Sequence, residues 1–178
     1  MLAAVISSSH LSLYARAKTP IEQAVGIQQD GVPAKMQIIG TWRLVSVYQE
    51  DEGGFEIDQF GGPPAGLFIA DSAGNFSFQI MSNHKRRLLF GLPPAVVMLR
   101  GDGLIEAATF FGSYIVDEKT RKLTLHVAHC LFGGCDRADR TAELTFHEDT
   151  LTMVSALDSS PTGAFYSHIV WKRECCRQ

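Results

Sequence analysis

A strand, a tight turn and a second strand follow one another in Gly66-Leu-Phe-Ile-Ala70, Asp71-Ser-Ala-Gly74 and Asn75-Phe-Ser-Phe-Gln-Ile-Met81. The two outer pieces are rich in aromatic and β-branched side chains, and in the second piece apolar and polar residues alternate with the period of a strand. The central piece has the composition of a hairpin turn. This stretch therefore predicts an antiparallel β-hairpin with two different faces.

The same alternation of short strands and polar turns continues on both sides of this hairpin. Further strands are predicted over residues 42–48, 55–60, 109–116, 123–130, 140–146, 150–155 and 165–173. About nine strands joined mostly by short turns are typical of an antiparallel meander, and closing such a sheet into a barrel removes its exposed edges. The predicted fold class is all-β: an antiparallel up-and-down β-barrel of roughly 8–9 strands with a short N-terminal helical segment.

Residues 1–37 differ from the rest because they lack alternating strands. Thr19-Pro-Ile-Glu22 combines a capping residue, a proline suited to the first helical position and a glutamate that can bond back to the cap, and Asp30-Gly31 ends the helix. We therefore expect residues 1–37 to form an N-terminal extension with a short helix and residues 38–178 to form the barrel. The extension is interpreted either as a docking helix that covers apolar surface or as a lid over a cavity.

Composition excludes several classes of partner for this chain of 178 residues. Its 16 Lys and Arg are outweighed by 19 Asp and Glu, and no long basic stripe gathers them, so no nucleic-acid partner is expected. No apolar run approaches the roughly 18 residues of a membrane-spanning helix, so no membrane partner is expected. The N-terminus has no basic residue before Arg16 and makes a poor secretory signal, which favours a cytoplasmic protein.

The cysteines are too few and too clustered for a disulfide scaffold. They are Cys130, Cys135, Cys175 and Cys176. Reduced thiols are the expected state, in line with a cytoplasmic location.

Alternation divides each predicted strand into two faces, and a barrel assigns one of them to its interior. In the strand over residues 42–48, burial of Arg43 or Gln49 would be costly, so the opposite face is expected inside. That face holds Trp42, Leu44, Ser46 and Tyr48. In the strand over residues 75–81, packing alone favours Phe76 and Phe78 inside, and the choice of face stays open.

Histidine and cysteine gather near the end of the strand over residues 123–130, where His126, His129 and Cys130 have the chemistry of metal ligands. Residues three apart in a regular strand point to opposite faces, which separates His129 from the other two, and no fourth ligand can be assigned. No metal site is therefore predicted, and His126 is interpreted as a hydrogen-bonded histidine inside the barrel. The chain also lacks a phosphate-binding Gly-rich loop, a nucleophile elbow and a dinucleotide fingerprint, so no cofactor is expected.

Gly40-Thr-Trp42 opens the first predicted strand and Trp171-Lys-Arg173 closes the last one. An arginine of the closing strand packed across the indole of the opening strand resembles the barrel-closing arrangement of lipocalins, with Gly40, Trp42 and Arg173 as the closing residues. Other segments agree in order and spacing: Phe60-Gly61, Gly66-Leu-Phe-Ile69, Gly74-Asn-Phe-Ser-Phe-Gln-Ile-Met81, Phe111-Gly-Ser-Tyr-Ile-Val-Asp117, Leu123-Thr-Leu-His-Val127 and Ile169-Val-Trp-Lys-Arg173. Over roughly residues 38–173 the chain resembles the bacterial and fungal lipocalin-like domain family.

The resemblance implies a barrel that holds a small hydrophobic or polyketide-like molecule. Similar small barrels in natural-product biosynthesis catalyse cyclisations such as intramolecular four-plus-two additions, some of them beneath an N-terminal lid. The expected function is therefore a cofactor-free cyclase or isomerase that works by positioning a flexible substrate. The alternative is a non-catalytic carrier or sequestering protein for a small hydrophobic ligand.

Polar groups that would polarise a substrate carbonyl are the expected catalytic residues: Tyr48, Gln79, Tyr114 and His126. The expected ligand-binding residues are Trp42, Leu44, Ser46, Ser77, Met81 and Cys130. The resemblance favours Ser77 and Gln79 as cavity-facing, which would turn Phe76 and Phe78 outward. Those phenylalanines would then need cover from a homodimer interface or from the N-terminal segment.

Overall fold

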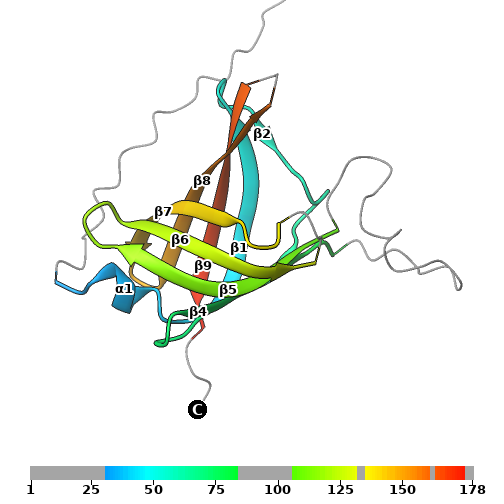
Figure 1. Cartoon of the computed structure of the whole chain (residues 1–178). Coiled ribbons are helices and arrows are strands. Elements are labelled where there is room, and N and C mark those ends of the chain that lie inside the picture. Colours follow the sequence, from blue (N-terminus) through cyan, green and yellow to red (C-terminus); the bar gives the residue numbers. More distant parts are fainter. Residues whose placement is uncertain (1–30, 84–105, 132–134, 161–162, 175–178) are drawn as a thin grey trace, which may run out of the picture.

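Eight antiparallel strands close into a barrel, and one further short strand is added at its side (Figure 1). The computed structural model describes residues 31–83, 106–131, 135–160 and 163–174, without the side chains of 157–160 and 163. The strands are β1 (Gly40–Asp51), β2 (Glu56–Ile57), β3 (Ala65–Ala70), β4 (Asn75–Met81), β5 (Ala107–Asp117), β6 (Lys122–Cys130), β7 (Asp139–His147), β8 (Thr150–Ser160) and β9 (Gly163–Arg173).

The strand pairing confirms the predicted antiparallel up-and-down barrel. From β3 to β9 each strand pairs with the next one in the sequence, and β1 pairs with both β3 and β9. The pairing of β1 with β9 closes the barrel, so neither β3 nor β9 is left as an open edge. The predicted strand over residues 55–60 is shorter than expected, because β2 pairs with β1 only through Glu56 and Ile57.

Large apolar side chains fill one end of the barrel. Trp42, Phe68 and Trp171 are fully buried there, and their rings come from β1, β3 and β9. Each of these side chains removes a large apolar area from water, which is the main stabilising contribution to a core. We call this the closed end.

A four-residue helix, α1 (Ala34–Gln37), packs against the closed end. Ala34 and the following Ile38 are buried in the same core cluster. The backbone N–H groups of Ala34 and Lys35 donate to the Glu118 carboxylate in the β5–β6 turn, at 2.7 and 2.8 Å. The described part of the N-terminal extension is thus joined to the barrel, whereas the helix expected after Thr19 lies outside the described residues.

A β-bulge in β1 changes which side chains face inward. The register between β1 and β9 shifts between Leu44 and Ser46, so Val45 is an extra residue and its side chain is 60% exposed. Because a bulge adds one residue, the alternation of faces reverses beyond it. The expectation that Ser46 and Tyr48 face inward with Trp42 is therefore wrong.

The structure shows which face of β4 points into the barrel, a choice that the sequence left open, and it is the apolar face that packing favours. Phe76, Phe78 and Ile80 are buried, whereas Ser77 and Gln79 lie on the outer face with Met81, which is 49% exposed. The face favoured by the family resemblance is therefore wrong. Since the phenylalanines are covered by the barrel itself, the argument that they need a dimer interface or the N-terminal segment no longer holds.

Candidate functional site

The barrel interior contains a partly open pocket of about 400 Å³, a volume within the range of small-molecule sites. Much of its wall is apolar and comes from Val47, Phe78, Ile80, Phe110, Met153 and Ile169. Polar lining is sparser and comes mainly from Gln49, Gln59, Arg140, Ser155 and Ser167. An apolar wall with a few polar groups is typical of sites for small molecules.

Polarity rises along one wall of the pocket with distance from the closed end. Three consecutive rows of paired residues cross β8, β9 and β1, and in order they are Leu151–Trp171–Leu44, Met153–Ile169–Val47 and Ser155–Ser167–Gln49. The first row belongs to the core, the second lines the pocket, and the third brings hydrogen-bonding groups to its outer part. We call the outer part of the pocket the mouth.

A line of ring contacts connects the mouth to the closed end. The Arg140 guanidinium carbon lies 5.7 Å from the centroid of Phe110, and Phe110 stacks on Phe78 at 4.4 Å. Phe78 in turn meets Trp171 edge-on at 5.4 Å. The buried indole N–H of Trp171 has no hydrogen-bond partner among the described residues, which is costly for a group shielded from water.

The closed end is held by Arg173, whose guanidinium carbon lies 4.1 Å from the centroid of the Trp42 ring. The same guanidinium donates to the backbone oxygens of Ile39, at 2.8 Å, and Gln37. Gly40 has a φ of +142°, and a Cβ atom added there would lie 2.8 Å from Arg173 Nη1. Trp42 and Leu44 face the interior, as expected. They belong to the closed end, however, and do not line the pocket.

Tyr48, an expected catalytic residue, lies on the outside of the barrel. Its ring stacks on that of His168 at 4.8 Å, and His168 Nε2 lies 3.3 Å from a Glu50 carboxylate oxygen. Burial raises the pKa of the Tyr48 hydroxyl, and the charges of Glu56 and Glu50 raise it further. Tyr48 is a neutral outer-face residue, while its neighbours Val47 and Gln49 line the pocket.

The structure does not bring the other expected catalytic residues together either. Gln79, on the outer face of β4, donates to Ser77 Oγ at 3.3 Å. Tyr114 is buried at the closed end of β5, where its hydroxyl donates to the Asp71 carbonyl oxygen at 2.7 Å. Burial and the charge of Asp71 both raise the pKa of Tyr114, which keeps this donor protonated.

His126 was expected inside the barrel and instead faces outward. On β6 the alternate residues Leu123, Leu125 and Val127 are buried, and His126 lies between them on the other face. Its Nδ1 atom is 2.7 Å from an oxygen of Asp139, the residue that pairs with it on β7. The expected catalytic set is thus spread over the outer surface and the closed end.

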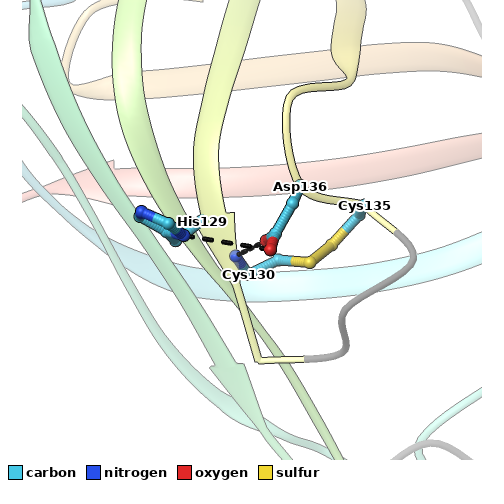
Figure 2. The surroundings of a disulfide bond; sticks show 4 residues. All are labelled: His129, Cys130, Cys135 and Asp136. Carbon is cyan, nitrogen blue, oxygen red and sulfur yellow. Dashed lines mark hydrogen bonds and ion pairs between the residues drawn. A yellow bond between two sulfur atoms is a disulfide. The ribbon is translucent and has the colours of Figure 1, made fainter.

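Cys130, an expected ligand-binding residue, forms a disulfide with Cys135, which corrects the expectation of reduced thiols for this pair (Figure 2). Asp136 lies beside the bond, and its carboxylate accepts a hydrogen bond from the Cys130 N–H at 2.8 Å. The other Asp136 oxygen is 3.8 Å from His129 Nδ1. Cys175 and Cys176 lie outside the described residues.

Neither a metal centre nor a membrane-spanning helix is found in the part of the chain that the structure describes. No group of three or more His, Cys, Asp or Glu residues there is arranged to hold a metal ion. No helix among the same residues is long and apolar enough to cross a membrane.

The polar residues of the mouth were missed by the sequence reasoning. Gln49 was excluded because of its burial cost, but it lies at the mouth and stays partly exposed. Arg140 is followed at every second position of β7 by an apolar residue, Ala142, Leu144 and Phe146, so its side chain lies on the same face of the strand. This alternation in the sequence could have identified Arg140 as a residue of the inward face. Nothing in the local sequence marks Ser155 and Ser167 as pocket residues. Their position at the mouth follows only from the strand register, which places them beside Gln49.

The chain was compared with curated proteins and with models of protein families. No curated protein matches the chain. A family model described as a lipocalin-like domain matches residues 39–174, which include every strand of the barrel. This match agrees with the closed eight-stranded barrel and with the arginine that covers the tryptophan of the first strand. The chain therefore belongs to the lipocalin-like domain family.

Proposed function

We propose that the barrel binds one small, mainly apolar molecule in its pocket of about 400 Å³. The observation that carries this proposal is the gradient along the wall, from the buried Trp171 row through Met153–Ile169–Val47 to the polar row with Gln49. An apolar ligand gains about 25 cal/mol for each Å² of apolar surface it removes from water. The polar row lets such a ligand keep one hydrogen-bonding group at the mouth.

Binding of N-phenyl-1-naphthylamine, a neutral apolar fluorophore, tests the proposal. Ala108 lines the pocket on β5, so Ala108→Phe fills space that the probe needs. Val45→Phe adds the same ring at the exposed bulge on the outside and is the matched control. We expect saturable binding of one probe per chain, loss of binding in Ala108→Phe, and unchanged binding in Val45→Phe.

Circular dichroism and thermal melts of both variants establish that each barrel is folded. Equal binding by folded Ala108→Phe and wild type would place the probe outside the pocket and contradict the proposal. Native mass spectrometry of the purified chain adds an independent readout, because a retained ligand appears as a defined increase in mass.

Ring closure of a bound linear substrate is a narrower function for the same pocket. Positioning alone can contribute up to about 7–11 kcal/mol to such a reaction, so no acid–base pair is required. The supporting observation is that Arg140, Gln49 and the two mouth serines line the pocket and can donate to a substrate carbonyl. The expected residues Tyr48, Gln79, Tyr114 and His126 do not support it, because none of them lines the pocket.

Incubation with a linear polyene carrying a carbonyl-activated alkene separates the two functions. A cyclase converts it to an isomer of unchanged mass and different retention, and Ala108→Phe abolishes the conversion. Recovery of the unchanged polyene from a chain that still binds the fluorophore identifies a carrier. Deleting residues 1–30 in the same assay tests the lid interpretation, because the loss of a lid is expected to slow turnover and to speed ligand release.

A further inference from the structure

Arg140 lies at the start of β7, on the inward-facing side of the strand, where it is exposed at the edge of the pocket. Along this strand the inward side chains are every second residue, and Leu144 and Phe146 are buried on that face. Arg140 has the same parity, and its cross-strand partner on β6 is Leu125, a residue of the pocket wall. Its guanidinium therefore lies over the pocket-facing ring of Phe110, at 5.7 Å.

Among the described residues, no carboxylate forms an ion pair with the Arg140 guanidinium. Arg140 and Asp139 are the only charged residues among the described residues that line it. The Asp139 carboxylate is turned to the outer face, where it lies 2.7 Å from His126 Nδ1. No hydrogen bond or ion pair joins the Arg140 side chain to another described residue, and its contact with Phe110 leaves its five N–H donors available.

An arginine held against an aromatic ring is suited to an anionic group. The contact between the cation and Phe110 restricts the rotamers of Arg140 and so lowers the entropy cost of using it in binding. The planar guanidinium matches a carboxylate through two parallel hydrogen bonds, which an ammonium group cannot reproduce. The apolar wall of Phe110 and Phe78 continues directly from this charge toward the interior.

We propose that the ligand of this pocket is an amphiphilic monocarboxylate, with its apolar chain along Phe110 and Phe78 and its carboxylate on Arg140. This inference rests on the proposed binding function and narrows it to one ligand class. The carboxylate stays at the mouth, where the Ser155–Ser167–Gln49 row supplies further hydrogen-bonding groups. Arg140 then determines specificity, and the aromatic wall supplies most of the affinity.

Decanoate and 1-decanol are the matched probes, because they share a chain length and differ in the charge of one end. Their dissociation constants are measured at pH 7.5 by displacement of N-phenyl-1-naphthylamine from wild type, Arg140→Gln and Lys172→Gln. Lys172→Gln removes the same charge from an exposed site at the closed end, where Lys172 pairs with Asp149, and is the control. We expect Arg140→Gln to weaken decanoate by about tenfold and 1-decanol by less than about twofold. Arg140→Lys is expected to recover only part of the decanoate affinity.

The outcomes separate this inference from the proposed function. If the fluorophore does not bind to wild type, the proposed function fails. If the fluorophore binds and decanoate does not displace it, the pocket binds apolar molecules but the carboxylate inference is wrong. If both probes bind and Arg140→Gln weakens them equally, the pocket binds apolar molecules but the carboxylate inference is wrong. If Lys172→Gln weakens decanoate as much as Arg140→Gln does, the effect comes from net charge and again contradicts the inference. Raising the salt concentration is expected to weaken decanoate selectively in wild type and to have little effect in Arg140→Gln.

Discussion

The guanidinium of Arg173 covers the ring of Trp42 at 4.1 Å, so the last strand of the barrel is tied to the first through a charge on an indole. The same group donates to backbone oxygens at Ile39 and Gln37, and the Trp42 indole N–H donates to the Ile38 oxygen at 2.8 Å. One side chain thus joins β9, β1 and the residues around α1.

Replacing Arg173 is expected to lower the free energy of unfolding. Arg173→Met removes the cation–π contact and two charge-assisted hydrogen bonds, and we expect a loss of about 2–4 kcal/mol. Arg173→Lys keeps the charge without the planar fork and is expected to give a smaller loss. Urea denaturation measures both. Lys172→Met, at the exposed neighbouring position, is the control, with a change expected within about 0.5 kcal/mol. Equal losses at positions 172 and 173 would contradict this account.

Gly40→Ala is expected to act through Arg173. Gly40 has a φ of +142°, and its added Cβ would lie 2.8 Å from Arg173 Nη1, which is held by its hydrogen bond to Ile39. Gly31 has a similar φ of +132° with nothing within 4 Å, so Gly31→Ala reports the backbone cost alone. We expect Gly40→Ala to be the more destabilising by about 1–2 kcal/mol.

A double-mutant cycle of Gly40→Ala with Arg173→Met checks the cause. If the added methyl group acts by displacing the guanidinium, the two losses overlap and the double variant is more stable than their sum. Additive losses would mean that the cost at Gly40 has another origin.

Most of the barrel could be predicted because its strands are short, alternating and separated by turn residues. The strand of Asn75–Met81 was predicted with its observed bounds, and the contact of Arg173 with Trp42 was expected from the resemblance to lipocalins. The faces beyond Val45 could not be predicted, because one extra residue reverses every later side chain and no local signal marks it. In β4 the apolar side chains gave the right face, and the family resemblance gave the wrong one.

Neighbouring substitutions in β1 test the reversal at the bulge. Gln49→Trp places a large ring at the mouth of the pocket, whereas Tyr48→Trp changes a ring on the outer face beside His168. We expect Gln49→Trp to weaken binding of the neutral fluorophore by about tenfold or more, since it occupies space the probe needs. Tyr48→Trp is expected to leave the dissociation constant within about twofold. The opposite ranking would mean that regular alternation continues through Val45.

The β3–β4 turn is expected to contribute stability that depends on pH. The side-chain amide and then the backbone N–H of Asn75 donate to the Asp71 carboxylate, at 2.9 and 2.8 Å, and hold its pKa below the ordinary value of 3.8. The folded state therefore releases this proton more readily than the unfolded state. The stabilisation is present above pH 3.8 and is lost as the pH falls below it, through the lower pKa of the folded state.

Asn75→Ala removes the main cause of that shift. The difference in melting temperature between wild type and Asn75→Ala is expected to shrink as the pH falls from 6 to about 2. Asn83→Ala is the matched control, because the Asn83 amide donates to the neutral carbonyl oxygen of Pro63 and its contribution does not depend on a carboxylate. A difference at Asn75 that stays constant over this pH range would contradict the assignment.

The Cys130–Cys135 disulfide is expected to have a limited effect on global stability. Its cysteines are separated by only 5 positions, and closing so short a loop restricts the unfolded chain by roughly 2 kcal/mol. Urea denaturation with and without a phosphine reductant measures this contribution. The variant Cys130→Ser/Cys135→Ser is the control, because the reductant should no longer change its midpoint. An equal shift in wild type and variant would locate the reducible bond elsewhere in the chain. Because the hydrogen bond from the backbone N–H of residue 130 to Asp136 involves neither sulfur atom, we expect reduced wild type and the variant to keep the same barrel, with faster amide exchange confined to the residues near Cys130.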